Sequence, residues 1–98
     1  MILLDVYTDA SPDGTLAILP GIGNPIINRS RLRGNGNMNR LEFEALRLAI
    51  DTFGPECRYY CDNKDARQRA RDIFLGYEIL KVSGNSNPAD KYTRYYKR

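Results

Sequence analysis

Residues 37–50, with the sequence NMNRLEFEALRLAI, are typical of the first turns of an amphipathic helix. At about 100° per residue, most apolar side chains of this stretch fall on one broad face. Glu44 lies on the opposite side, where a charged residue faces solvent, whereas Glu42 falls near the middle of the apolar face. An ionised carboxylate there is costly unless it is paired or binds a metal ion. Glu42 therefore needs a structural or a chemical explanation.

A capping box offers the structural explanation. Asn39 stands three residues before Glu42, the spacing at which a cap side chain and a later carboxylate each bond to the other residue's backbone N–H. Considered alone, Glu42 favours this interpretation over a chemical role. The other carboxylates change that balance, and their positions depend on the elements around the helix.

Turn residues and hydrophobic periodicity predict those elements. Before the helix, the turns SPDG and GIGN separate three strands, at residues 2–9, 15–21 and 25–32. The helix runs from about residue 40 to residue 53. After it come a strand at 57–62, a helix at 64–75, a strand at 77–83 and a final helix that starts at Pro88 behind Asn87 as its cap.

These elements predict an α/β fold in the order β-β-β-α-β-α-β-α. Strands joined by tight turns pair antiparallel, whereas strands that alternate with helices join a sheet in parallel. We therefore expect one five-stranded mixed sheet, three antiparallel strands followed by parallel ones, with helices packed on it. A chain of 98 residues has room for one such domain, which would span residues 1–98.

The composition is that of an ordinary globular protein, with 42% hydrophobic and 28% charged residues. No apolar run approaches membrane-spanning length. The opening MILLDV is too short, and too soon followed by Asp5 and Asp9, for a signal peptide. We expect a cytoplasmic protein with no membrane partner. The net charge of +3 is compatible with a nucleic-acid partner but does not identify one.

The chain contains two cysteines, Cys57 and Cys61, and no histidine. Zinc sites of the usual Cys/His type and histidine-dependent catalysis are therefore nearly excluded. On one strand the two sulfur atoms would lie roughly 13 Å apart, at about 3.3 Å per residue, which is too far for an intrachain disulfide. We expect both cysteines to be small core residues, so catalytic chemistry would depend on carboxylates.

Three more carboxylates stand at the ends of predicted elements. Asp9 ends the first strand, Asp62 ends the strand at 57–62, and Asp90 lies in the first turn of the last helix. If the strands of Asp9 and Asp62 are parallel neighbours, their carboxyl ends meet at one sheet edge, near the start of the helix that carries Glu42. Each aspartate alone has a structural explanation, as a turn residue or at a helix N-terminus. Together the four carboxylates indicate one site.

The chemistry of such a cluster is limited. Unpaired carboxylates that lie together repel one another and raise each other's pKa unless a cation neutralises them. Oxygen ligands without imidazole or thiolate select Mg²⁺ or Mn²⁺. Two such ions about 4 Å apart can activate a water molecule on one side of a phosphodiester and stabilise the leaving oxygen on the other. The cluster therefore predicts phosphodiester hydrolysis without histidine.

The order of elements and four stretches resemble type 1 ribonuclease H over nearly the whole chain. The stretches are YTDAS at 7–11, NRLEFEAL at 39–46, YYCDN at 59–63 and NPADKYTRY at 87–95. The resemblance implies an endoribonuclease that hydrolyses the RNA strand of RNA–DNA hybrids with two Mg²⁺ or Mn²⁺ ions. The catalytic and metal-binding residues that it implies are Asp9, Glu42, Asp62 and Asp90. Helix periodicity and the resemblance thus select Glu42 rather than Glu44.

The resemblance also implies how the hybrid is held. Enzymes of this family read 2′-hydroxyl groups across a minor groove. The residues implied in substrate binding here are Asn37, Asn39, Arg40, Ala10 and Ser11. The arginines between residues 64 and 71 are candidates for phosphate contacts, although a solvated helix face is the simpler account of most of them.

The chain departs from the family in features that concern substrate binding. Ala10 replaces a frequent glycine, the chain has no tryptophan, and the helix at 64–75 leads directly to the strand at 77–83. There is no basic protrusion of the kind that grips the hybrid in some members. These differences predict weak substrate binding but leave the metal site intact.

Two other functions stay open. A related nuclease of the same fold, such as a junction resolvase, would cleave DNA, and a non-catalytic domain would bind nucleic acid or protein. We expect a monomer, in which the rings of Tyr92, Tyr95 and Tyr96 pack on the sheet rather than form a dimer interface.

Overall fold

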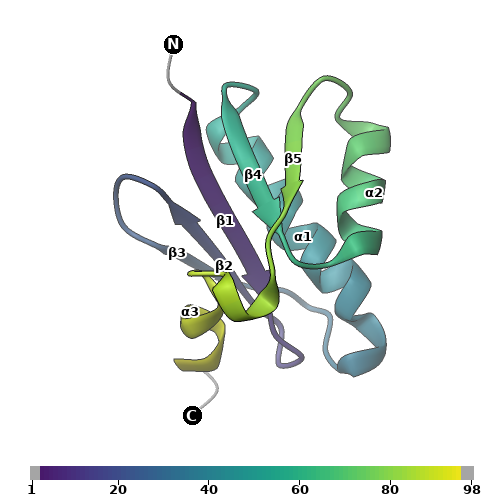
Figure 1. The fold of residues 1–98 in the computed structure, drawn as a ribbon. Helices are drawn as coiled ribbons and strands as arrows, with labels where there is room; N and C mark the ends of the chain where they lie inside the picture. Colours follow the sequence, from purple (N-terminus) through teal and green to yellow (C-terminus); the bar gives the residue numbers. More distant parts are fainter. Residues whose placement is uncertain (1–2, 96–98) are drawn as a thin grey trace.

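The computed structural model describes residues 3–95, apart from the side chains of residues 94 and 95. Figure 1 shows one twisted sheet with helices packed against it. The elements are β1 (Leu4–Ala10), β2 (Thr15–Pro20), β3 (Ile26–Arg29), η1 (Asn35–Asn37), α1 (Met38–Phe53), β4 (Cys57–Cys61), α2 (Lys64–Ile73), β5 (Glu78–Lys81), η2 (Gly84–Ser86) and α3 (Asp90–Tyr95).

The strands form a mixed sheet in the order β3-β2-β1-β4-β5. β2 pairs antiparallel with both β1 and β3, so the first three strands make two hairpins. β4 pairs parallel with both β1 and β5, and a helix lies in each of these crossovers. The predicted α/β class and the five-stranded mixed sheet are confirmed. The pairing of β1 with β4 is the one that matters for the site.

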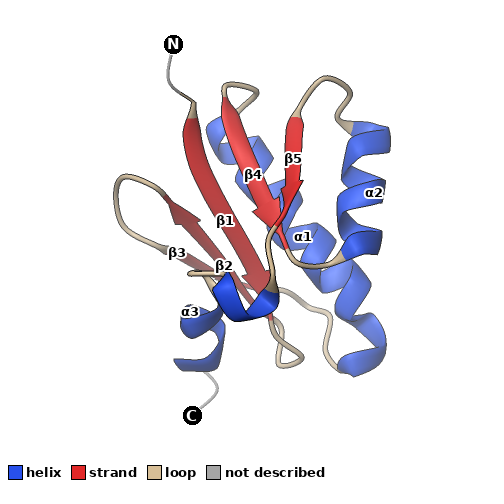
Figure 2. Cartoon of the chain, viewed as in Figure 1, coloured by secondary structure: helices blue, strands red, loops and turns tan. Residues whose placement is uncertain are grey.

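Helices lie on both faces of the sheet (Figure 2). α1 contacts β1, β2 and β4, and α2 contacts α1, β4 and β5. α3 contacts β1 and β2 from the other face. Side chains alternate between the two faces along a strand, so β1 can contact helices on both sides of the sheet. Val6 of β1 packs in the core beneath α1, whereas Asp9 accepts a hydrogen bond from Thr93 of α3. None of the described helices has both the length and the apolar character needed to cross a membrane.

The main hydrophobic core lies between the sheet and the α1–α2 layer. Ile18 of β2, Tyr59 of β4 and Leu46 of α1 are all 0% exposed in this core. The Tyr59 hydroxyl donates to the Gly54 carbonyl at 2.6 Å, so this large buried side chain has no orphaned polar atom. The core holds α1 against the sheet and thereby fixes the depth of Glu42.

Both cysteines are buried and unpaired, as the sequence predicts. Cys57 and Cys61 belong to the same inner face of β4 as Tyr59, with exposures of 6% and 0% for the two cysteines. They act as small core residues on this face, although Glu42 and Asp62 also lie close to Cys61.

Two predicted helix starts are wrong. α1 begins before Asn39, which therefore lies inside the helix rather than at its cap. α3 begins at Asp90, two residues later than the predicted start at Pro88. The chain forms a turn first, in which the Asn87 side chain accepts the backbone N–H of Ala89 at 3.1 Å. Asn87 thus accepts a hydrogen bond as a cap does, but it closes a turn and not the helix.

The helix predicted at 64–75 is shorter in the structure, and its apolar residues differ in burial. Ala66 and Ala70 are buried, but Ile73 is 54% exposed. The helix ends at Ile73, and the half-buried Phe74 packs against the core in its place. Arg67 is buried although its type suggests a surface residue, because its Nη1 donates to the Cys61 carbonyl at 2.8 Å.

The tyrosines of the C-terminal segment are described only in part. Tyr92 is half-buried, and the Lys91 ammonium lies 5.2 Å from the centre of its ring. The side chain of Tyr95 and the whole of Tyr96 lie outside the described residues.

Leu46→Ala should lower the free energy of unfolding by about 2–5 kcal/mol, because it removes a fully buried side chain from the core and leaves a cavity. Urea unfolding followed by circular dichroism measures the change. Leu75→Ala is the matched control, because Leu75 is 81% exposed, and it should shift stability by at most about 0.5 kcal/mol. Equal losses in the two variants would contradict this packing of α1.

Candidate active site

Asp9, Glu42, Asp62 and Asp90 come from elements that meet at one edge of the sheet. Asp9 lies near the end of β1 and Asp62 directly follows β4. These strands are parallel neighbours, so their carboxyl ends lie side by side. Glu42 reaches this edge from the inner face of α1, and Asp90 is the first residue of α3 on the other face. The structure therefore brings together all four predicted carboxylates.

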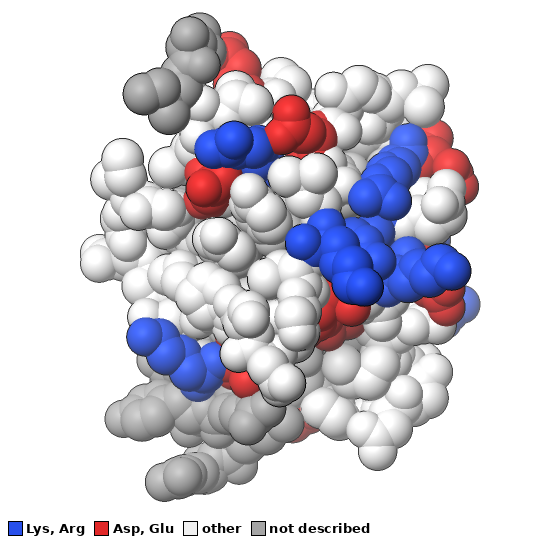
Figure 3. All heavy atoms as spheres, viewed as in Figure 1, with Lys and Arg blue, Asp and Glu red and all other residues white. Residues whose placement is uncertain are grey.

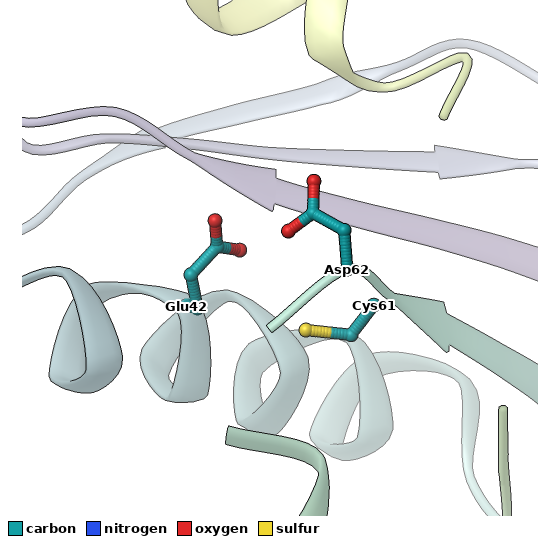
Figure 4. Close-up of side chains that lie close together, drawn as sticks. All are labelled: Glu42, Cys61 and Asp62. Atoms are coloured by element: carbon teal, nitrogen blue, oxygen red, sulfur yellow. The ribbon is translucent and has the colours of Figure 1, made fainter. Parts of the chain in front are cut away.

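Glu42 is buried without a hydrogen-bond partner for one of its oxygens. The residue is 4% exposed, and within the described part of the chain Oε1 is the buried side-chain oxygen that no donor reaches. Burial raises the pKa of Glu42 to about 10, with further repulsion from Asp9 and then from Asp62. Without a cation, Glu42 is thus protonated at neutral pH. Figure 4 shows its carboxyl group turned toward that of Asp62.

Asp9 is 3% exposed and also carries a perturbed carboxyl group. Burial raises its pKa to about 7, and the negative charge of Asp62 adds to the effect. The Thr93 hydroxyl opposes this shift, because its Oγ1 lies 3.0 Å from Asp9 Oδ2 and donates to the ionised carboxylate. The same Oγ1 lies 2.8 Å from the Asp90 carbonyl. A single hydroxyl thus connects the acid of β1 to the helix that carries Asp90.

Asp62 and Asp90 are the half-buried members of the cluster. Burial raises the pKa of Asp62, hydrogen bonding with Asn87 and Glu42 lowers it, and the charge of Asp90 raises it again. Asn87 also donates from Nδ2 to the Thr8 carbonyl of β1 at 2.9 Å. Asn87 therefore attaches the segment before α3 to the strand that carries Asp9.

This donor set fits hard divalent cations. The side chains offer carboxylate oxygens, the ligands that Mg²⁺ and Mn²⁺ prefer. Burial and mutual repulsion make the ionised forms of Asp9 and Glu42 unfavourable, and a bound cation would remove both penalties. It would also give Glu42 Oε1 the partner that the described residues do not provide.

The capping-box explanation of Glu42 is wrong. No side-chain cap precedes α1, and Asn39 turns instead toward the start of α2. Its Nδ2 donates to Asp65 Oδ2 at 2.8 Å, and its Oδ1 accepts from Asn63 Nδ2 at 2.9 Å. Because α1 begins earlier than predicted, Glu42 lies a full turn inside the helix and faces the sheet.

The other predicted substrate residues lie near the cluster in different environments. Asn39 and Arg40 are exposed at the start of α1. Asn37 is half-buried and donates from Nδ2 to the Arg33 carbonyl at 2.8 Å. Ala10 and Ser11 are buried beside Asp9, and the Ser11 hydroxyl donates to Asp13 within the β1–β2 turn. Ala10 packs in a small core cluster with Leu41, and the Ser11 hydroxyl shapes the turn, whereas Asn39 and Arg40 face solvent.

Lysine and arginine side chains gather over α2 and the end of β5 (Figure 3). Several of the α2 arginines serve the fold, since Arg71 donates to the Ile79 carbonyl and Arg69 stacks 4.3 Å above the centre of the Phe43 ring. Lys64 and Lys81 are exposed. Arg69 and Arg71 are nevertheless exposed, in keeping with the solvated helix face expected from the sequence, whereas Arg67 is buried.

Three residues of the site did not stand out in the sequence. Thr93 is three residues after Asp90 and so shares its helix face, which is the signal that locates it. The sequence suggests Asn87 only as a helix cap and Cys61 only as a core residue. Their contacts with the cluster depend on pairings between segments far apart in the chain.

No family model matches this chain, and no curated protein or solved structure matches it either.

In the absence of divalent cations, stability should fall as the pH rises from about 5 to about 8. The pKa values of Asp9 and Glu42 are raised to about 7 and about 10, so the folded state binds more protons than the unfolded state across this window. The stabilisation is complete below the unfolded pKa values near 4, decreases as the pH rises toward the folded ones, and is lost above them. Thermal unfolding in EDTA at stepped pH measures it. A Tm that increased over this window would contradict the burial of these acids.

Glu42→Gln should be at least as stable as the native protein at about pH 8 in EDTA, and its stability should depend less on pH. Glutamine has nearly the same shape as protonated glutamate and cannot ionise. The measurement is urea unfolding at two pH values, with the exposed Glu56→Gln as the control that keeps the native pH dependence. Severe unfolding of Glu42→Gln would instead assign Glu42 a purely structural role.

Proposed function

We propose that this chain is a metal-dependent nuclease with a ribonuclease H-like fold, which hydrolyses the RNA strand of RNA–DNA hybrids. One observation carries the proposal: Asp9 and Asp62 lie beside a buried Glu42 whose Oε1 no described donor reaches, and Asp90 lies beside Asp9 and Asp62. Buried polar atoms in proteins are almost always hydrogen-bonded, so an exception needs an explanation. A divalent cation explains it, whereas a purely structural role for Glu42 does not.

The order of the elements supports the same assignment. Two hairpins precede α1, and two parallel strands follow with α2 between them. This is the order on which the resemblance to type 1 ribonuclease H rests. A metal-binding glutamate on the helix after three strands favours this family over DNA-cleaving relatives of the same fold.

In the proposed enzyme, Asp9, Glu42, Asp62 and Asp90 hold two Mg²⁺ or Mn²⁺ ions. When bound, the ions supply an activated water molecule and stabilise the leaving oxygen of the phosphodiester. The protein contributes rigidity, because strand pairing between β1 and β4 fixes the spacing of Asp9 and Asp62. Thr93 orients the Asp9 carboxylate by donating to Oδ2.

The hybrid substrate is proposed from the resemblance and from exposed groups beside the acids. Asn39 is exposed, and beyond its bonds to Asp65 and Asn63 its amide has a second N–H and a second lone pair, as recognition of a 2′-hydroxyl requires. Arg40, Lys64 and Lys81 are exposed and suited to phosphates. Only a short loop separates α2 from β5, so no basic protrusion adds to the grip. Binding should therefore be weak and strongly reduced by salt.

Cleavage of labelled RNA–DNA hybrid should require Mg²⁺ or Mn²⁺ and should stop in EDTA. Asp62→Asn should reduce the rate at least about a hundredfold, because it removes a ligand charge while keeping the side-chain shape. Asp51→Asn is the matched control, since Asp51 is exposed in an i,i+4 pair with Arg47 on the outer side of α1, and it should retain the native rate. Electrophoresis of the products measures both.

Parallel incubations with duplex RNA, duplex DNA and a four-way DNA junction identify the other functions. Cleavage of the junction or duplex DNA alone would replace the hybrid nuclease with a DNA nuclease. Tight nucleic-acid binding without any cleavage would assign a non-catalytic domain.

A further inference from the structure

Cys61 adds a sulfur atom to the carboxylate cluster. Its Sγ, one Glu42 oxygen and one Asp62 oxygen all lie within 4.8 Å of one another. The residue is 0% exposed, and its Sγ lies 3.9 Å from the Asn63 carbonyl. Figure 4 shows the sulfur on the α1 side of the two carboxyl groups. The set Glu42, Cys61 and Asp62 therefore differs in chemistry from an all-oxygen site.

We propose that Glu42, Cys61 and Asp62 form a binding site for a thiophilic divalent cation such as Cd²⁺ or Zn²⁺. Independent support comes from Glu42, which is 4% exposed, turned toward Asp62, and carries the unpartnered Oε1 described above. A cysteine or a group of acids alone would not define a site. Here a buried sulfur lies close to a buried carboxyl group, one oxygen of which has no described donor.

The distances allow one ion to reach all three ligands. Zn²⁺ binds sulfur at about 2.3 Å and carboxylate oxygen at about 2.0–2.2 Å, so its ligand atoms lie about 3.5 Å from one another in a tetrahedral site. Ligand atoms that are now within 4.8 Å need to approach by little more than about 1 Å. Rotation of the Glu42 and Asp62 side chains can supply that movement, and water completes the coordination.

The thiol decides which cations are favoured. Mg²⁺ and Mn²⁺ prefer oxygen ligands and gain little from sulfur, whereas thiolates select softer cations. On binding, the Cys61 S–H bond breaks, its proton passes to water, and a metal–sulfur bond forms. Protonated Glu42 loses its proton to water in the same way. No oxidant or reductant takes part in these steps.

Occupation by a soft cation would block the hard-cation site, because both use Glu42 and Asp62. Zn²⁺ or Cd²⁺ should therefore inhibit hybrid cleavage in competition with Mg²⁺. This inhibition rests on the proposed function, but the binding of a soft cation does not. The two proposals can accordingly fail separately.

Titration of the protein with Cd²⁺ tests the binding site directly. The native protein should develop the ultraviolet charge-transfer band of a cadmium–thiolate bond, and calorimetry should give the affinity. Cys61→Ser and Cys61→Ala should both lose the band and bind Cd²⁺ at least about tenfold more weakly, while their affinity for Mn²⁺ changes less than about twofold. Two replacements guard against a folding defect in either one.

Cys57→Ser is the matched control, because Cys57 is also buried and lies four residues earlier on the same face of β4. It should keep the band and the Cd²⁺ affinity. Absence of the band in the native protein, or its loss in Cys57→Ser but not in Cys61→Ser, would overturn the proposed site. A band without Mg²⁺-dependent hybrid cleavage would support the soft-cation site and count against the nuclease.

Discussion

Burial of the Glu42 carboxyl group is the constraint on which the site depends. The hydrophobic contacts of α1 with the sheet hold this side chain inside, where ionisation is unfavourable and Oε1 has no described donor. Without a cation, the group is neutral at physiological pH because its pKa is raised to about 10. The hydrophobic core thus compensates for the unfavourable burial of the Glu42 carboxyl group, as is common where a protein binds a charged ligand.

Strand pairing brings other acids close to this buried carboxyl group, so that they form one site. The parallel pairing of β1 with β4 places Asp9 and Asp62 at one edge, and α1 crosses beneath it with Glu42. Asp62 then raises the pKa values of Asp9 and Glu42, and Asp9 raises that of Glu42, so protons and cations compete for the same oxygens. Cys61 belongs to this competition because β4 ends with the thiol on the inner face and the next residue is Asp62.

Polar contacts with β1 help to fix the position of Asp90. α3 spans only Asp90–Tyr95, too short to be stable by itself. Asn87 bonds to β1 through the Thr8 carbonyl, and Thr93 bonds to Asp9. α3, which carries Asp90, is thus attached to β1, which carries Asp9. The protonation state of Asp9 affects that attachment.

The sequence by itself determined the order of the elements and the mixed sheet. It also determined where the four acids lie relative to the ends and faces of those elements, because turns, periodicity and helix-facing positions are local properties of the chain. It also marked Glu42 as unusual, since a carboxylate on an apolar helix face is visible without a structure. Only the tertiary structure decided between a cap and a buried acid for Glu42, and placed Thr93 and Cys61 among the acids. Those outcomes depend on where α1 begins and on contacts between residues such as Asp9 and Thr93, which are distant in the chain and adjacent only after the sheet has formed.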